Sequence, residues 1–220
     1  MSRDYGQYCG LARALDVVGE RWNLLIVRQL LIGAARYGEL RDGLAGIASN
    51  LLTDRLRNLE AAGVIERRLS GDANAITYAL TPWGAQLREP INALIRWSTP
   101  LMIRGTEEDE FRPDGLLVAL PALLDGRAPT DQSVAAGITV DGTTVQLRAT
   151  KSGIDVAAPD GRELDAVLTA EAPIVLGLAA GVLKLDDVAE LVHIDGDESA
   201  LRNFFDAPGR SSDHVGSIER

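Results

Sequence analysis

Apolar residues recur at helical spacing through the first third of the chain and then give way to two short alternating runs. Two apolar stretches, 10–18 and 22–32, are each followed by a glycine and predict two short helices, and residues 36–40 open a third that ends near Gly43. A fourth helix is expected over 49–62, where leucines 52, 56 and 59 fall on one face. The runs 64–69 and 76–80 flank the turn-forming residues 70–74, so they predict a hairpin.

The 49–62 helix is polar on the face opposite its leucines. That face carries Asn50, Thr53, Asp54 and Arg57. The hairpin that follows holds two adjacent arginines, Arg67 and Arg68. A polar-faced helix beside a basic hairpin suits a DNA major groove and its flanking phosphates. The pattern is therefore typical of a winged helix-turn-helix.

A further helix is expected to begin just after the hairpin. Thr81 is a suitable N-cap, and Pro82 fits the first helical position because its missing N–H costs nothing there. Pro90 is expected to break or kink this helix. Beyond it an apolar stripe continues to Met102, and such a stripe suits contact with a partner helix.

Charge divides the chain into two parts. Residues 1–104 contain 13 arginines, no lysine and 10 acidic residues, a formal charge of +3, whereas residues 105–220 carry −13. The overall charge of −10 therefore hides a mildly basic first part. We expect a domain boundary in the acidic stretch 105–110, giving domains over 1–104 and 110–206 and a flexible tail over 207–220.

The second part predicts an α+β domain built on an antiparallel sheet. A helix around 114–124 precedes three alternating runs, 134–140, 145–149 and 154–158, which are separated by turn residues and indicate a meander. A fourth run at 166–170 and further elements complete the domain. These further elements are a helix over 173–182, a shorter one near 186–190, a strand at 191–194 and a last helix over 197–205.

The first part resembles the HxlR-type transcriptional regulators, winged-helix relatives of the MarR group. The resemblance covers about residues 5 to 102 in unbroken order and rests on four strings: 9–22, 36–40, 52–60 and 80–84. It implies a homodimer whose two recognition helices enter successive major grooves of a palindromic operator. It also implies a dimer contact made by the first helix and the helices after the wing. The corresponding apolar residues are Leu11, Leu15, Ile91, Leu94, Ile95 and Trp97.

The second part is similar, at the level of pattern, to the sterol-carrier-protein-like fold, an antiparallel sheet covered by helices around an apolar tunnel. The matching stretch is mainly 168–205. This resemblance implies a domain that either senses an apolar small molecule or has only kept the scaffold.

Several residues are candidates for contact with double-stranded DNA, and the alternative for each is a solvated helix face. Arg57 suits a guanine edge, Asn50 an adenine, and Thr53 a methyl group or base edge. Asp54 accepts from a cytosine amine or pairs with a nearby arginine, and Arg55 holds a phosphate, a base or an internal carboxylate such as Glu60. Backbone contacts are expected from Arg36, Tyr37, Arg67, Arg68 and Ser70, and Ser49 and Asn58 complete the candidate set. Because the wing turn 70–74 is short, minor-groove contact is less expected than phosphate contact.

The single cysteine has two interpretations. Cys9 lies just before the first helix, whose N-terminus lowers a thiol pKa and favours the reactive thiolate. Some HxlR-type regulators sense oxidants or electrophiles near this place. The alternative is a small apolar residue at the dimer contact. One cysteine forms no internal disulfide, so a cytoplasmic location is expected.

Other classes of function have little support in the sequence. No nucleotide-binding glycine loop, zinc motif or nucleophile elbow is present, so neither an enzyme, a metal site nor a cofactor is expected. No apolar run is long enough for a membrane span. The sequence favours a DNA-binding repressor with an apolar effector; the alternatives are a thiol-based sensor and a ligand carrier that does not bind DNA.

Overall fold

The chain folds as two α+β units. The computed structural model describes residues 4–70, 75–102 and 111–208, and it divides the chain into the compact units Met1–Ile91 and Asn92–Arg220. The expected boundary at 105–110, most of the wing turn and most of the predicted tail lie outside the described residues. Each unit is considered by itself below.

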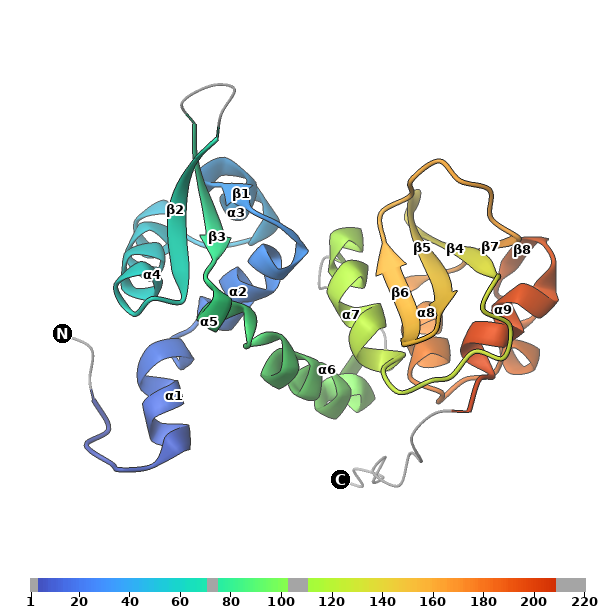
Figure 1. The fold of residues 1–220 in the computed structure, drawn as a ribbon, viewed down its shortest axis with the longest axis horizontal. Helices are drawn as coiled ribbons and strands as arrows, with labels where there is room; N and C mark the ends of the chain where they lie inside the picture. The colour runs from blue at the N-terminus through green and yellow to red at the C-terminus, as the bar shows by residue number, and fades with distance from the viewer. Residues whose placement is uncertain (1–3, 71–74, 103–110, 209–220) are drawn as a thin grey trace. The chain divides into compact units, whose positions relative to one another are not determined.

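Four helices form the body of the first unit (Figure 1). They are α1 (Gly10–Val18), α2 (Asn23–Ile32), α3 (Tyr37–Gly43) and α4 (Ser49–Ala61). All four lie where the sequence predicts them. The leucines of α4 are buried together with Ile26 and Leu40, so the helix rests on a common core with its polar side outward.

A three-stranded antiparallel sheet completes the winged arrangement. Its strands are β1 (Ala35–Arg36), β2 (Ile65–Ser70) and β3 (Ala75–Leu80), in the order β1-β3-β2. The hairpin was predicted, but β1 was not, because two residues are too few to show a period. Pairing of β1 with β3 joins the start of α3 to the hairpin.

Thr81 caps the helix after the hairpin, as its sequence context predicts. Its Oγ1 accepts a hydrogen bond from the Gly84 N–H at 3.0 Å, and α5 (Pro82–Ala85) begins at the following proline. The expectation that Pro90 breaks the helix is wrong, because the break falls earlier, before α6 (Arg88–Met102). Pro90 lies in the first turn of α6, where a missing N–H has no helical partner to lose.

The second unit contains a five-stranded sheet. Its strands are β4 (Ala135–Val140), β5 (Thr143–Thr150), β6 (Gly153–Ala157), β7 (Ala166–Thr169) and β8 (His193–Gly196), in the order β6-β5-β4-β7-β8. The meander β4-β5-β6 is antiparallel as predicted, but β7 pairs parallel with β4. The prediction of a wholly antiparallel sheet is therefore wrong. Residues 158–165 return the chain past β4, where the Leu164 side chain lies beside Gly137, and β7 then enters in the direction of β4.

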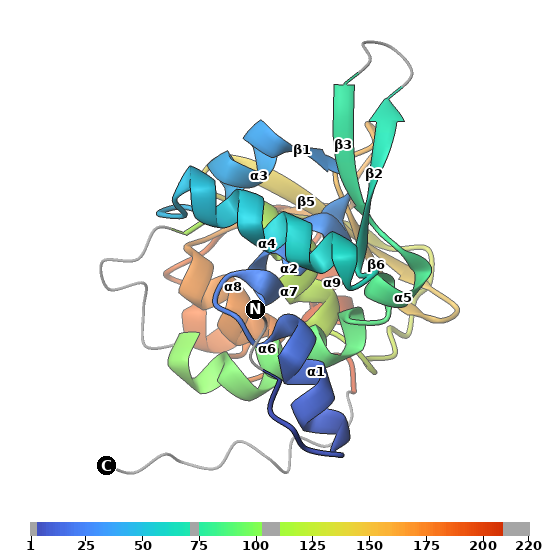
Figure 2. The ribbon, with the colours of Figure 1, turned by 90° about the vertical axis from the view of Figure 1, so that its left-hand side faces the viewer.

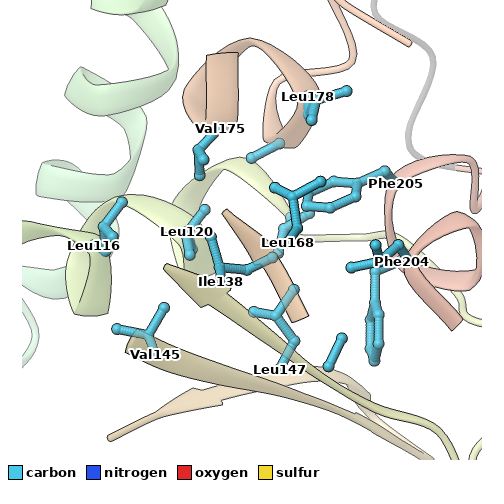
Figure 3. Close-up of a cluster of buried hydrophobic side chains, with 14 of the residues drawn as sticks. Leu116, Leu120, Ile138, Val145, Leu147, Leu168, Val175, Leu178, Phe204 and Phe205 are labelled. Atoms are coloured by element: carbon cyan, nitrogen blue, oxygen red, sulfur yellow. The ribbon is translucent and has the colours of Figure 1, made fainter. Parts of the chain in front are cut away.

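Helices cover one face of this sheet and enclose its apolar core. They are the short 3-10 turn η1 (Pro113–Gly115), α7 (Leu116–Leu123), α8 (Ala172–Ala179), the 3-10 turn η2 (Leu185–Val188) and α9 (Glu198–Phe205). Figure 3 shows side chains of these helices meeting those of the sheet. The labelled residues are Leu116, Leu120, Ile138, Val145, Leu147, Leu168, Val175, Leu178, Phe204 and Phe205. Strand alternation therefore points apolar residues toward the helices and polar ones away from them.

One buried arginine joins two helix ends in the second unit. Arg127 is only 8% exposed, and its guanidinium donates to backbone carbonyls at the C-terminal ends of both α8 and α9. The bonds to Leu178 and Ala179 measure 3.2 and 2.8 Å, and those at α9 reach Phe204 and Phe205. A positive charge at helix C-termini is favourable, so Arg127 satisfies carbonyls that would otherwise lack partners.

Candidate nucleic-acid interface

The exposed side of α4 presents a row of polar side chains. Figure 2 shows α4 crossing the first unit with the β2-β3 hairpin beside its C-terminal end. Asn50, Asp54 and Arg57 are all exposed and follow one another at helical spacing. Arg57 Nη1 lies 3.9 Å from Asp54 Oδ1, so the pairing considered for Asp54 is a long one between two exposed side chains. A guanidinium held this weakly can turn toward a base edge.

The first turn of α4 is tied to α3. The Tyr37 hydroxyl donates to the Ser49 carbonyl oxygen at 2.8 Å. Thr53 Oγ1 lies 2.9 Å from the same carbonyl and 3.4 Å from the Tyr37 hydroxyl. The structure thus brings these three predicted residues together, with Tyr37 and Thr53 bonded inside the protein at the N-terminal end of α4.

Arg55 differs from the other predicted contacts because its side chain is only 15% exposed. Its Nη2 lies 2.9 Å from Glu20 Oε2, and its Nε donates to the Arg21 carbonyl at 3.1 Å. The internal carboxylate considered for Arg55 was Glu60, and that detail is wrong. The residue that reaches Glu60 is Arg67, with its Nε 2.8 Å from Oε1.

The arginines of the wing lie on opposite faces of the sheet. Register places Arg36 and Arg68 on either side of Thr77, and therefore on one face. Arg67 pairs across the hairpin with Tyr78, so it lies on the other face of the sheet. There it bonds to Glu60 of α4. The sequence places the two arginines side by side but cannot show that alternation separates them.

Arg67 and Arg68 each have an acidic neighbour on the protein. Glu66 lies 2.7 Å from Arg68 Nε, and Glu60 raises the pKa of Arg67 through a hydrogen bond and charge attraction. Exposed ion pairs contribute little stability, so a phosphate can replace either carboxylate at small cost. Asn58 is exposed next to Arg57, and the Ser70 side chain lies outside the described residues.

The apolar residues assigned to a dimer contact fall into two groups. Leu11 and Trp97 are 69% and 76% exposed, and Leu15 and Leu94 are also exposed. Ile95 is half-buried. Ile91 is only 5% exposed and belongs to the core of its own protomer, so its assignment to a surface contact is corrected.

The first unit also has an apolar groove that sequence reasoning missed. Its volume is about 410 Å³, and α1, α5 and the start of α6 line it. Its apolar lining includes Val17, Val64, Trp83 and Leu87. No local sequence pattern could have shown this groove, because its lining comes from three separate stretches of the chain, 10–18, Val64 and 83–90.

Cys9 is exposed at the N-cap position of α1. Backbone N–H groups of Ala12 and, to a smaller extent, Leu11 lower the pKa of the thiol. This agrees with the direction expected for a cysteine at a helix N-terminus.

The described residues were compared with the requirements of a metal cluster and of a membrane-spanning helix. Across 4–70, 75–102 and 111–208 no cluster of three or more His, Cys, Asp or Glu side chains is placed to hold a metal ion. Among the helices of those same segments, none has the length and apolar character needed to cross a membrane.

Comparisons with known proteins find similarity in the first part of the chain. The profile of the HxlR-like helix-turn-helix family matches residues 17–105. The uncharacterized HTH-type transcriptional regulator YvaP of Bacillus subtilis is 34% identical over 88 residues, which cover 40% of this chain and 82% of that protein. Rv3095 of Mycobacterium tuberculosis, named in the same way, is 39% identical over 95 residues, covering 43% of this chain and 60% of its own length. Among solved structures, the reduced form of the regulator YodB from B. subtilis is 27% identical, covers 45% of this chain and 99% of that one, and superposes with a TM-score of 0.39.

Proposed function

This chain belongs to the HxlR-like helix-turn-helix family of DNA-binding transcriptional regulators, and we propose that it is a repressor that binds its operator as a homodimer. One observation carries the proposal: α4 rests on a leucine face and turns Asn50, Asp54 and Arg57 outward beside an arginine-bearing hairpin. Arg57 and Asn50 have the donors that suit guanine and adenine edges. Arg36 and Arg68, on one sheet face, suit neighbouring phosphates.

The proposed homodimer uses apolar surface that the protomer leaves open. Leu11 and Leu15 are exposed on α1, and Leu94 and Trp97 are exposed on α6. Exposed apolar patches of this kind mark contact surfaces. Two recognition helices then read half-sites about one duplex turn, roughly 34 to 36 Å, apart.

Footprinting on the DNA directly upstream of the gene tests this function. We expect two protected half-sites with centres about 10 base pairs apart, arranged as a palindrome. Protection without sequence preference, or no protection at low salt, would contradict the proposal.

The second unit is the proposed sensor of an apolar small molecule, on a sterol-carrier-protein-like scaffold over about 110–206. Its support is a sheet whose apolar face is covered by helices on one side only. A ligand there regulates DNA binding only if it prefers one of two arrangements of the dimer. Displacement of a fluorescent fatty acid by apolar compounds, with release of operator DNA, is the expected result; binding that leaves operator affinity unchanged would remove the sensor role.

Thiol sensing through Cys9 is a second candidate, because the thiol is exposed and its pKa is lowered by α1. A lowered pKa keeps more thiolate present near neutral pH, and the thiolate is the reacting species. Alkylation with N-ethylmaleimide should then reduce the operator affinity of the wild-type protein and leave that of the Cys9→Ser variant unchanged. Equal responses of the two proteins would exclude this candidate.

A further inference from the structure

Arg55 lies on the recognition helix but is bonded to a distant part of the chain. Its side chain is 15% exposed, whereas that of Arg57, two residues later, is 75% exposed. Both of its described hydrogen bonds go to the turn that joins α1 to α2, through the Glu20 carboxylate and the Arg21 carbonyl. Arg21 and Glu20 lie 34 and 35 residues before Arg55 in the sequence.

The turn that Arg55 holds has a defined and strained geometry. Trp22 has a φ of 83°, a left-handed conformation that is costly for a bulky residue. The Arg21 guanidinium lies 5.2 Å from the centre of the Trp22 ring. Asn23 is 1% exposed, and its side chain donates to the Val17 carbonyl of α1 at 2.9 Å. Such a conformation persists only where its surroundings fix it.

We infer that Arg55 is a positioning residue, which clamps the recognition helix to the α1–α2 turn and does not contact DNA. The inference rests on the proposed function. Its consequence is regulatory: α1 carries Cys9 at its start and lines the apolar groove, and its C-terminal end leads directly into the clamped turn. A displacement of α1 therefore reaches α4 through Glu20 and Arg55, and it alters the presentation of Asn50 and Arg57.

Glu20 gives a test in which electrostatics and positioning predict opposite results. Glu20 is acidic and its side chain is 61% exposed, so removing its charge should strengthen binding to any DNA if only charge matters. If Glu20 holds Arg55 in place, its removal should weaken binding to the operator specifically. If Arg55 instead contacts a phosphate, a third result is expected. Removing Arg55 should then lower the slope of log affinity against log salt concentration by about one.

The experiment measures affinities of the full-length protein for promoter and random duplexes across a salt series. We expect Glu20→Ala to reduce the ratio of promoter to random affinity about tenfold, with an unchanged salt slope. Arg55→Ala also loses the bond to the Arg21 carbonyl, so it should reduce the ratio at least as much as Glu20→Ala. The double variant should be no worse than Arg55→Ala alone, because Glu20 acts through Arg55. Arg55→Lys keeps the pair with Glu20 and should recover part of the ratio.

Asp42→Ala is the matched control, since Asp42 is an exposed acid of the same unit, 3.0 Å from Arg41. It should leave the ratio unchanged. Tighter binding of Glu20→Ala to both duplexes, additive effects in the double variant, or a lower slope for Arg55→Ala would overturn the clamp. Glu20→Ala alone decides the question if Arg55→Ala fails to fold. If the wild-type protein shows no preference for promoter DNA, the proposed function and the clamp are both wrong. If the wild-type protein prefers promoter DNA and Glu20→Ala keeps the same preference, only the clamp is wrong.

Discussion

Arg57 and Arg68 are both exposed arginines of the proposed DNA surface, but Arg57 is expected to read a base and Arg68 to contact a phosphate. Arg57 stands on the outward face of α4, so Arg57→Ala should reduce discrimination between operator and random DNA by about 1 to 3 kcal/mol. Arg68→Ala should weaken both duplexes equally and lower the salt slope by about one. Competition binding with the two duplexes measures both effects. An equal loss on both for Arg57→Ala would exclude base reading by this residue.

Arg127 is expected to be the most important arginine for stability of the second unit. Its removal leaves carbonyls of α8 and α9 without their buried donor. Arg127→Met should lower the free energy of unfolding by about 3 kcal/mol, measured by urea titration followed by circular dichroism. Lys151→Met, at an exposed turn of the same unit, should change it by less than about 0.5 kcal/mol. Similar values for the two variants would contradict this role.

At the residue scale, sequence reasoning identifies side-chain types better than their partners. The outward positions of Asn50 and Arg57 follow from the leucine period. The partner of Arg55 does not, because Glu20 is far away in the chain. Ile91 fits the apolar stripe by spacing, yet the protomer core buries it, and spacing alone cannot distinguish these outcomes.

At the scale of elements, the close approach of α5 to the start of β2 depends on one glycine. A Cβ on Gly84 would lie 1.9 Å from the Val64 carbonyl oxygen, a backbone atom that cannot move aside easily. Gly84→Ala should therefore lower the free energy of unfolding by about 2 kcal/mol. The melting temperature should fall with it.

Gly38 offers the matched glycine, because a Cβ there meets nothing within 4 Å and the residue lies in the first turn of α3. Gly38→Ala should be neutral or stabilise the protein by up to about 1 kcal/mol. Thermal unfolding of the two variants compares them directly. Equal tolerance of alanine at both positions would show that the α5 contact can relax.

The elements that the sequence predicted are those with a repeating apolar period. Helices α1, α2 and α4, the hairpin and the meander are of this kind. Strand β1 has only two residues, and the parallel pairing of β7 depends on where residues 158–165 return the chain. Neither length nor period in the sequence encodes these features.

At the scale of the whole molecule, the apolar stripe of α6 is the proposed basis of assembly. Leu94 and Trp97 are 47% and 76% exposed on neighbouring turns. Replacing both by glutamate should convert the dimer to a monomer at micromolar concentration, measured by sedimentation velocity, because a buried contact would have to accommodate unpaired charges. Leu191→Glu, at a 63% exposed leucine elsewhere, should leave the dimer intact. Dissociation by both changes, or by neither, would contradict a specific contact through α6.

The uneven charge of the chain bears on how the whole protein meets DNA. The first 104 residues are formally +3 and the remainder −13, so phosphate attraction is confined to the first part. Whole-chain charge alone would have argued against nucleic acid. The family match over residues 17–105 agrees with the view that DNA binding is a property of the first part.

Fluorescence anisotropy of the purified protein with its own promoter DNA and with a random duplex, across a salt series, tests the central claim most directly. The account predicts tighter binding to the promoter, with both affinities falling steeply as salt rises. Binding that is absent at low salt with Cys9 reduced, or equal for the two duplexes at every salt concentration, would contradict it.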